Sequence, residues 1–295
     1  MTDEPHRYRS PDEDSARWRG FPFRDGDIVV STRSKSGTTW MQMICALLVL
    51  RTPELPVPLA ELSPWLDWLV EPRDDVFRRL AAQRHRRIVK THTPLDGVPL
   101  DARARYVVVA RHPLDMAVSL YYQAADNLDQ RRLRELTGSA AFADRPKPRP
   151  TVDEWLARWV DDDPDPRAEL DSLPGVLWHL GDAWGRRHEP NVLLVHYDDL
   201  STDLAGQMGR LAAWLELDPP APELVEAATF DRMRERADRL APDPAGILLD
   251  RRAFFRRGRS GQGREVLAAP ALARYRARVA DLAPADLLAW LHRAP

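Results

Sequence analysis

The sequence predicts an α/β fold: a single domain with a central parallel sheet flanked by helices. Two observations indicate this fold. Four short segments are almost continuously apolar, as strands buried on both faces of a parallel sheet are, and helical patterns lie between and after them. The 295 residues are 44% hydrophobic and 30% charged, a composition that fits one globular core.

The local patterns place the main elements. Residues 27–33 (DIVVSTR) predict the first strand, and the loop SKSGTTW leads from it into a helix whose apolar residues, from Trp40 to Leu48, share one face. Three further strands are expected at residues 87–91, 105–110 and 191–196. His92 lies just past the strand at 87–91, so it is expected at the carboxyl edge of the sheet, where ligands bind in open α/β sheets.

Other segments are expected to be less regular. Residues 1–20 are strongly charged and predicted to be flexible, and residues 126–150, which end in a proline-rich run, predict a mobile loop. Residues 271–293 predict two short helices separated near Pro284. No break is long and flexible enough to require a domain boundary, so we expect one domain over residues 1–295.

Composition and charge exclude several classes of protein. The 43 basic and 45 acidic residues give a net charge of −2, which does not favour a nucleic-acid partner. The longest nearly apolar stretch, residues 40–50, is far shorter than the ~20 residues of a membrane span, and residues 1–20 lack the apolar core of a secretory signal. We therefore expect a cytoplasmic protein with no membrane span. The single cysteine, Cys45, is expected in the core and leaves no disulfide framework or multi-cysteine metal site.

The loop SKSGTTW has the features of an anion-binding site. Gly37 lets the backbone approach a ligand closely, and the amides at the start of the following helix can bind a phosphate. Thr38 and Thr39 add hydroxyl donors, and Lys35 adds a mobile ammonium group. The alternative is an ordinary turn capped by Ser36 or Thr38. The nucleoside-triphosphatase pattern G-x-x-x-x-G-K-S/T is absent, because here the lysine precedes the glycine.

Four later segments follow this loop in a fixed order. They are KTHTP at 90–94, RHPLDMAVS at 111–119, VLLVHYDDL at 192–200 and FFRRGRSGQGR at 254–264. Together with SKSGTTW, they resemble the cytosolic-type sulfotransferase family. The resemblance implies a P-loop-like phosphosulfate-binding loop and the donor 3′-phosphoadenosine 5′-phosphosulfate (PAPS), whose sulfuryl group passes to a hydroxyl or amine, leaving 3′-phosphoadenosine 5′-phosphate (PAP). It implies no metal.

The resemblance also implies the catalytic residues, which are Lys35, Lys90, His92 and Ser119. His92 is expected to act as the general base, since a neutral imidazole can accept a hydroxyl proton at neutral pH. Lys35 is expected to stabilise the leaving group, and Lys90 to reach a sulfuryl oxygen. The chain has only three lysines among its 43 basic residues, and two of them fall at these positions.

A set of donor-binding residues is implied in the same way. The 3′-phosphate is expected to contact Arg111, Ser119, Arg256, Arg257 and Gly258. The adenine is expected to contact Trp40, Tyr197, Thr229 and Phe230. The loop residues Lys35, Ser36, Gly37, Thr38 and Thr39 would bind the phosphosulfate. Residues 251–264 hold six arginines and no acid, which independently favours an anionic ligand.

Two other functions fit parts of this pattern. The loop by itself is compatible with a P-loop kinase or nucleotide hydrolase, and the arginine run with a non-catalytic anion-binding or nucleic-acid-binding module. The chain also departs from the family: Arg33 and Ser34 replace Tyr-Pro, Thr93 replaces leucine, and Gly263 replaces tryptophan. The acceptor is expected to be a hydroxylated small molecule shaped by residues 126–150 and 65–68. The sequence leaves its identity and the oligomeric state open.

Overall fold

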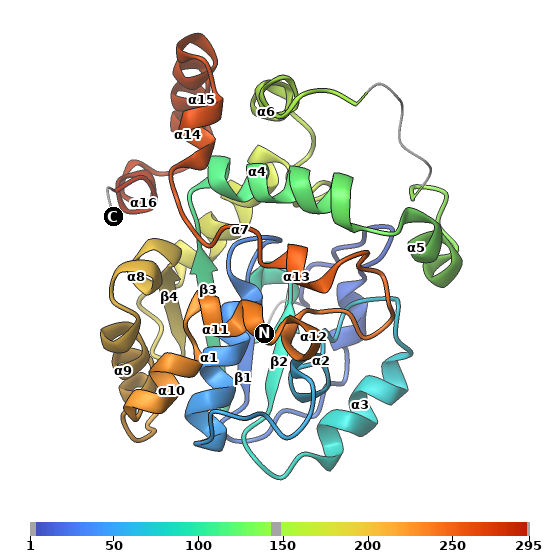
Figure 1. The fold of residues 1–295 in the computed structure, drawn as a ribbon, viewed down its shortest axis with the longest axis vertical. Helices are drawn as coiled ribbons and strands as arrows, with labels where there is room; N and C mark the ends of the chain where they lie inside the picture. The colour runs from blue at the N-terminus through green and yellow to red at the C-terminus, as the bar shows by residue number, and fades with distance from the viewer. Residues whose placement is uncertain (1–3, 143–148, 294–295) are drawn as a thin grey trace.

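The four strands form one parallel sheet. The computed structural model describes residues 4–142 and 149–293, and the strand order is β2-β1-β3-β4 (Figure 1). The strands are β1 (Ile28–Ser31), β2 (Ile88–Thr91), β3 (Arg105–Ala110) and β4 (Val192–His196). Ile28 pairs with Ile88 on one side and with Arg105 on the other. Every predicted strand is confirmed within two residues of its expected limits.

Helices cover both faces of the sheet, and they include the expected helix after the first loop. The helical segments are η1 (Ser15–Trp18), α1 (Thr38–Leu50), α2 (Leu59–Leu62), α3 (Arg73–Ala82), η2 (Leu95–Gly97), α4 (Pro113–Tyr122), η3 (Gln123–Asn127), α5 (Gln130–Thr137), α6 (Val152–Asp161), α7 (Leu173–Gly185), α8 (Tyr197–Thr202), α9 (Leu204–Trp214), α10 (Pro222–Ala227), α11 (Phe230–Glu235), α12 (Ala237–Leu240), α13 (Arg251–Phe254), α14 (Gln262–Val266), α15 (Ala269–Leu282) and α16 (Ala285–Leu291). The break between α15 and α16 confirms the expected separation near Pro284.

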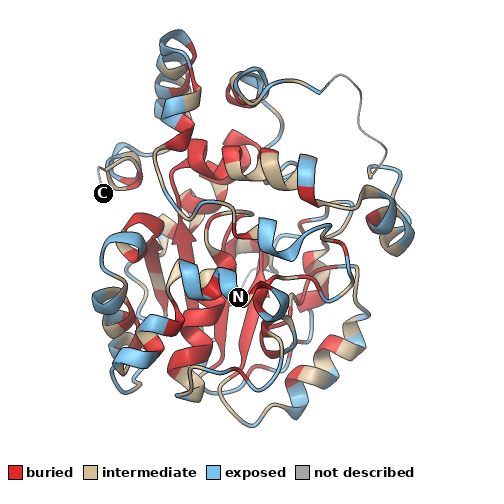
Figure 2. Cartoon of the chain, in the orientation of Figure 1, coloured by how far each residue is buried: buried red, intermediate tan, exposed pale blue. Residues whose placement is uncertain are grey.

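The core has two layers because successive strand residues point to opposite faces. Val29 and Val108 pack with α4, α6, α7 and α15, whereas Val30 and Val109 pack with α1, α9 and α10. Both faces of the sheet are therefore buried, as Figure 2 shows for the strands. Cys45 is fully buried in the second layer, as expected. No helix in the described part of the chain is both long and apolar enough to cross a bilayer.

The expectation that residues 1–20 are flexible is wrong for residues 4–20, which pack against the domain. Tyr8 is 3% exposed, and its hydroxyl accepts a hydrogen bond from Trp178 Nε1 at 2.8 Å while contacting the Asp96 carboxylate. Trp18 is 1% exposed and donates to Asp67 Oδ2 at 3.2 Å. These aromatic anchors outweigh the charged composition of the segment, because burying large rings contributes more than surface charges cost.

The expected loop over residues 126–150 contains a helix. Helix α5 begins after Asp129, whose side chain accepts a hydrogen bond from the Arg132 amide at 2.9 Å, and ends at Gly138 in the left-handed conformation. Capping at both ends stabilises a short helix here. The proline-rich run at the end of the segment predicts irregular structure and gives no indication of this helix. Residues 143–148 lie outside the described residues.

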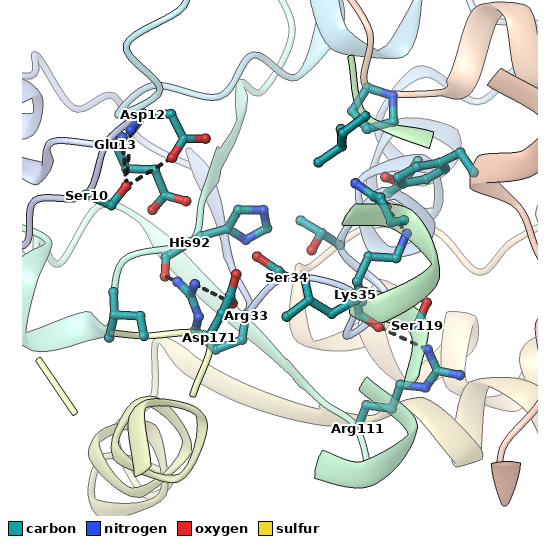
Figure 3. A pocket seen from close by; sticks show the side chains of 18 of the residues that line it. Ser10, Asp12, Glu13, Arg33, Ser34, Lys35, His92, Arg111, Ser119 and Asp171 are labelled. Atoms are coloured by element: carbon teal, nitrogen blue, oxygen red, sulfur yellow. Dashed lines mark hydrogen bonds and ion pairs between the residues drawn. The ribbon is translucent and has the colours of Figure 1, made fainter. Parts of the chain in front are cut away.

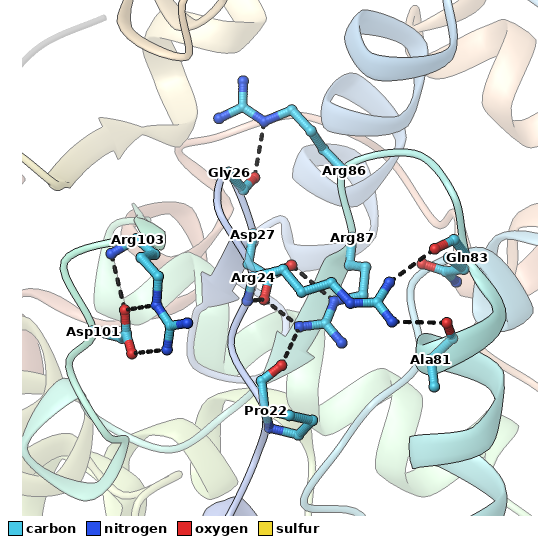
Figure 4. Close-up of polar contacts among 10 residues, drawn as sticks. All are labelled: Pro22, Arg24, Gly26, Asp27, Ala81, Gln83, Arg86, Arg87, Asp101 and Arg103. Carbon is cyan, nitrogen blue, oxygen red and sulfur yellow. Dashed lines mark hydrogen bonds and ion pairs between the residues drawn. The ribbon is translucent and has the colours of Figure 1, made fainter.

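A buried ion pair holds the sheet at the amino ends of β1 and β2 (Figure 4). Arg87 Nε donates to Asp27 Oδ1 at 2.8 Å, and its Nη2 donates to Asp27 Oδ2 and to the Pro22 carbonyl. Both side chains of the pair are 1% exposed. Removing one member of a buried ion pair leaves the other charged and unpaired, which destabilises the folded state. This ion pair therefore stabilises the end of the sheet opposite the carboxyl ends of the strands.

Asp27→Asn should therefore lower the free energy of unfolding by about 3–5 kcal/mol, since Arg87 would keep its charge without a partner. Urea denaturation followed by tryptophan fluorescence measures this loss. The matched control is Asp101→Asn, which breaks a surface ion pair with Arg103 at 2.7 Å and should cost much less. Equal losses in the two variants would contradict the structural role of the buried pair.

Candidate functional site

The carboxyl ends of three strands meet at one cavity. The chain leaves β1 into the loop at 32–37, leaves β2 into His92, and leaves β3 into Arg111. Since parallel strands end at the same edge of the sheet, these residues lie together, and they line a cavity of about 630 Å³. One cleft therefore contains both the expected base and the expected phosphate-binding loop.

Most of the expected site residues line this cavity. They are Lys35, Gly37, Thr38, Thr39, Trp40, Lys90, His92, Arg111, Ser119, Tyr197, Phe230, Arg256, Arg257 and Gly258. Ser36 and Thr229 are not among the lining residues. The Ser36 amide donates to the Arg33 carbonyl at 3.2 Å, and the Thr229 hydroxyl donates to the Glu226 carbonyl at 2.8 Å. Both residues instead stabilise local turns beside the cavity.

The phosphate-binding loop turns sharply before α1. Lys35 has a φ of 61° and Gly37 a φ of 104°, so two residues of the loop adopt positive φ angles that favour glycine. A Cβ at position 37 would lie 3.0 Å from the Tyr197 ring. Gly37 therefore lets this ring approach the backbone at the start of α1, where amide groups face an incoming anion.

Arginine side chains supply positive charge at one end of the cavity. Arg111 donates to the carbonyls of Lys35 at 3.0 Å and of Arg259 at 3.1 Å, and its guanidinium lies 4.3 Å from the Tyr197 ring centroid. Arg256 donates to Gln262 Oε1 at 2.7 Å and lies over the Tyr122 ring. Within residues 4–142 and 149–293, neither forms an ion pair with a carboxylate, and each has a buried Nε without a partner.

The closing segment at 254–264 packs tightly against the rest of the site. Gly258 has a φ of 62°, and a Cβ there would lie 2.4 Å from the Phe230 ring. Gly263 donates its amide to Asp115 Oδ1 at 2.7 Å, and a Cβ there would lie 2.3 Å from Leu114. The family departure at Gly263 therefore allows the segment to lie directly on α4.

Lys35 is held by uncharged groups beside this positive charge. Its Nζ donates to Gln123 Oε1 and lies 3.9 Å from the Phe254 ring centroid. Burial lowers the pKa of Lys35 to about 7, and the charges of Arg111, Arg256 and Lys90 contribute to the shift. The ammonium form of Lys35 therefore lacks a counter-charge that an anionic ligand can supply.

His92 has one ring nitrogen that is available to accept a proton. Its Nδ1 contacts the Thr32 carbonyl oxygen, which can only accept, so Nδ1 carries the hydrogen and Nε2 keeps its lone pair. No residue in the described ranges donates a hydrogen bond to Nε2. The ring meets Trp65 edge-on, with centroids 4.6 Å apart. Burial holds the pKa of His92 well below its usual value, and the cations Lys90 and Arg33 add to this effect.

Lys90 packs against the same tryptophan, Trp65, as His92. Its Nζ is 3.8 Å from the Trp65 ring centroid. Burial lowers the pKa of Lys90 to about 8, although the nearby carboxyls of Glu13 and Asp67 oppose the shift. Figure 3 shows His92, Lys35, Arg111 and Ser119 around the same space.

The sequence analysis missed several residues of the site. Gln123 contacts Lys35 and follows Ser119 by four residues, a spacing that places both on one side of continuous helical turns. That spacing is the signal that would have identified it. Arg33 donates to Asp171 Oδ1 at 2.6 Å and to the His92 carbonyl, so this departure from the family stabilises the base. Nothing in the motifs points to Asp171.

Among the residues that the structure describes, no group of three or more His, Cys, Asp or Glu side chains is arranged to hold a metal ion.

Comparisons with known proteins agree with this geometry. The family model of the sulfotransferase domain matches residues 25–277. A glycolipid sulfotransferase of Mycobacterium bovis (strain BCG) is 43% identical over 97% of this chain and 93% of that protein. Human sulfotransferase 2B1 is 28% identical over 81% of this chain and 60% of that protein.

Solved structures share the fold. A retinol dehydratase in complex with androsterone and the inactive cofactor PAP superimposes with a TM-score of 0.66, covering 90% of this chain and 83% of that one at 22% identity. A mouse sulfotransferase complexed with PAP gives a TM-score of 0.65, covering 90% and 88% at 18% identity. The match to the family model over most of the chain, together with the near-complete match to the mycobacterial enzyme, shows that this chain belongs to the sulfotransferase family.

Proposed function

We propose that this sulfotransferase moves the sulfuryl group of PAPS to a hydroxyl group of a small-molecule acceptor. The observation that carries the proposal is the arrangement within one cavity of an imidazole with a free Nε2 and an ammonium group with no anionic partner in the described structure. In-line displacement requires a base on the attacking side and a cation on the leaving side. His92 and Lys35 fit these two roles.

The donor would occupy the arginine-rich end of the cavity. Arg111, Arg256 and Arg257 would bind the 3′-phosphate together with the Ser119 hydroxyl, because guanidinium groups pair well with phosphate oxygens. Trp40 and Phe230 would bind the adenine ring between them, and the Trp40 indole is fixed by its hydrogen bond to the Ala228 carbonyl at 2.8 Å. Tyr197 offers a further adenine contact. The backbone amides of the loop would bind the phosphosulfate.

The transfer step follows from these positions. His92 Nε2 accepts the hydroxyl proton while the acceptor oxygen forms a bond to sulfur and the bond from sulfur to the 5′-phosphate oxygen breaks. Lys35 stabilises the negative charge that develops on the leaving oxygen, and Lys90 binds a sulfuryl oxygen. PAP leaves with the electron pair, and the product is a sulfate ester. Fixed donors of this kind can stabilise the transition state without a metal ion.

The acceptor we propose is an amphiphile with a hydroxylated head group. The mycobacterial relatives are named as glycolipid sulfotransferases. The cavity offers matching surfaces, because Leu128, Leu133 and Phe142 line one part of it and the polar residues Asp12 and Glu13 line another. These three apolar residues belong to the segment at 126–150, which the sequence analysis expects to shape the acceptor side, and other apolar residues such as Leu120 and Ile247 also line the cavity. Trp65 and Trp68 also line the cavity.

The two other functions are less well supported. A kinase or nucleotide hydrolase is disfavoured because the family model and the relatives are sulfotransferases. Within the arginine run, Arg256 and Arg257 line the cavity, and Arg251 and Arg259 form ion pairs with Asp243 and Glu265. A nucleic-acid module is disfavoured because the charge of the run is partly neutralised and partly directed into the cavity.

His92→Ala tests the proposed base. With labelled PAPS and an acceptor found by screening alcohols, phenols, sterols and alkyl glycosides, we expect the variant to lose about 10²–10⁴-fold in transfer rate. Calorimetry should give a PAP affinity within about twofold of wild type, because the imidazole lies on the acceptor side of sulfur. A variant that transfers sulfate at the full rate would show that His92 is not the base.

The pKa of Lys35 predicts a pH dependence of donor binding. Without PAP, burial places the pKa of Lys35 at about 7, and a bound phosphate would raise this pKa. At pH 8, Lys35 should therefore take up close to one proton when PAP binds. The affinity for PAP should fall as the pH rises above 7, by at most about tenfold per pH unit for a single proton. At pH 6 the amine is already protonated, and uptake at Lys35 should be small.

Calorimetry in buffers of different ionisation enthalpy measures this uptake. Lys35→Met should remove most of one proton from the value at pH 8, whereas any contribution from Lys90 should remain. A PAP affinity that strengthens from pH 7 to pH 9, or an uptake that is unchanged in Lys35→Met, would contradict this linkage.

A further inference from the structure

The segment at 8–13 forms one wall of the acceptor side of the cavity. Tyr8, Arg9, Ser10, Asp12 and Glu13 all line it. In Figure 3, the Glu13 side chain lies on the opposite side of His92 from Lys35. A molecule whose reacting hydroxyl meets His92 would therefore place its neighbouring atoms near Glu13.

Backbone hydrogen bonds fix the position of Glu13. The residues on either side of it are tied to one neighbouring segment: the Asp14 amide donates to the Asp67 carbonyl at 2.9 Å, and the Leu69 amide donates to the Asp12 carbonyl at 2.7 Å. That segment is in turn paired with β2, because the Leu66 amide donates to the Lys90 carbonyl at 3.1 Å. Glu13 is thus held in register with the strand that leads to His92.

Glu13 differs in its hydrogen-bond partners from two other acidic residues that line the cavity, Asp12 and Asp171. Asp12 accepts hydrogen bonds from the Ser10 hydroxyl at 3.1 Å and from Trp68 Nε1 at 3.3 Å, and Asp171 accepts one from Arg33 at 2.6 Å. No hydrogen bond to the Glu13 carboxyl is formed within residues 4–142 and 149–293. Burial raises the pKa of Glu13 well above its usual value, although Arg33 opposes the shift.

Glu13 is partly exposed in the cavity, so its carboxyl is open to a hydrogen bond from a ligand there. Hydroxyl groups are suitable partners because they can both donate and accept, so they match the carboxyl in either protonation state. Two groups of the cavity can each bind a hydroxyl of the same molecule. His92 Nε2 can accept a hydrogen bond from one hydroxyl, and the Glu13 carboxyl can hydrogen-bond to another. A molecule with a single hydroxyl would leave Glu13 without a partner.

We propose that Glu13 binds a second hydroxyl of the acceptor and thereby makes the enzyme select polyhydroxylated head groups over simple alcohols. This inference rests on the proposed function, because it takes the hydroxyl at His92 as the site of transfer. It assigns Glu13 a role in specificity. A site built to bind a substrate hydroxyl can reject the analogue without it by as much as about 10⁴–10⁵-fold.

Octyl glucoside and its monodeoxy analogues provide the test. Product analysis first identifies the hydroxyl that receives sulfate. One of the analogues that keep this hydroxyl lacks the hydroxyl bound by Glu13. For that analogue, the kcat/KM of wild type should be at least about 10²-fold lower than for octyl glucoside. Glu13→Leu should lose a similar factor in kcat/KM on octyl glucoside itself. Its kcat/KM values for octyl glucoside and for that analogue should be nearly equal.

Two controls separate recognition from misfolding. Glu13→Gln keeps a hydrogen-bonding group and should retain most of the discrimination. Glu4→Gln changes a 73% exposed carboxyl that precedes the segment at 8–13. This variant should match wild type in kcat/KM on every analogue. All three variants should bind PAP as wild type does, since Glu13 lies on the opposite side of His92 from the donor groups.

The outcomes also separate this inference from the proposed function. Equal losses in Glu13→Leu on octyl glucoside and on every analogue would overturn the inference, as would sulfation of simple alcohols or phenols by wild type without sulfation of octyl glucoside. In both cases the proposed function would stand. The absence of transfer from PAPS to any acceptor would overturn the proposed function.

Discussion

The rest of this structure depends on two arginines at the carboxyl edge of the sheet, Arg111 and Arg256, whose charge no carboxylate of the described residues neutralises. Arg111 and Arg256 are held by backbone carbonyls, an amide side chain and aromatic rings. These groups orient a guanidinium without cancelling its charge, so the cavity keeps a field suited to anions. Burial is the main cause of the lowered pKa of Lys35, and the nearby cations lower it further because they disfavour its ammonium form.

Two acidic residues near the site, Asp115 and Asp198, are engaged by neutral donors, which preserves this field. Asp115 accepts hydrogen bonds from the amides of Gly261 and Gly263 at 2.8 and 2.7 Å, and Asp198 contacts the Ser260 hydroxyl. The closing segment is thereby anchored through its glycines and serine, and not through Arg256. At the opposite end of the sheet the pattern reverses, because Asp27 and Arg87 neutralise each other in the core.

The parallel sheet could be predicted from the sequence, and so could most of the residues that line the cavity at its carboxyl edge. Strands such as 105–110 are nearly all apolar, and loop residues such as Lys35 fall in motifs whose spacing reflects the chemistry of a phosphate. The wall at 8–13 could not, because it reaches the cavity through tertiary contacts between distant segments. Glu13 lies in a charged stretch that predicts flexibility, and the buried rings of Tyr8 and Trp18, together with backbone hydrogen bonds to the segment at 67–69, bring it to the cavity.

The wall that contains Glu13 lies outside the residues matched by the family model, which begin at position 25. The residue proposed to select the acceptor and the residues proposed to bind the donor therefore lie in separate stretches of the chain. On this proposal, substitutions at 8–13 would change which molecules are sulfated and leave the nucleotide-binding residues in place.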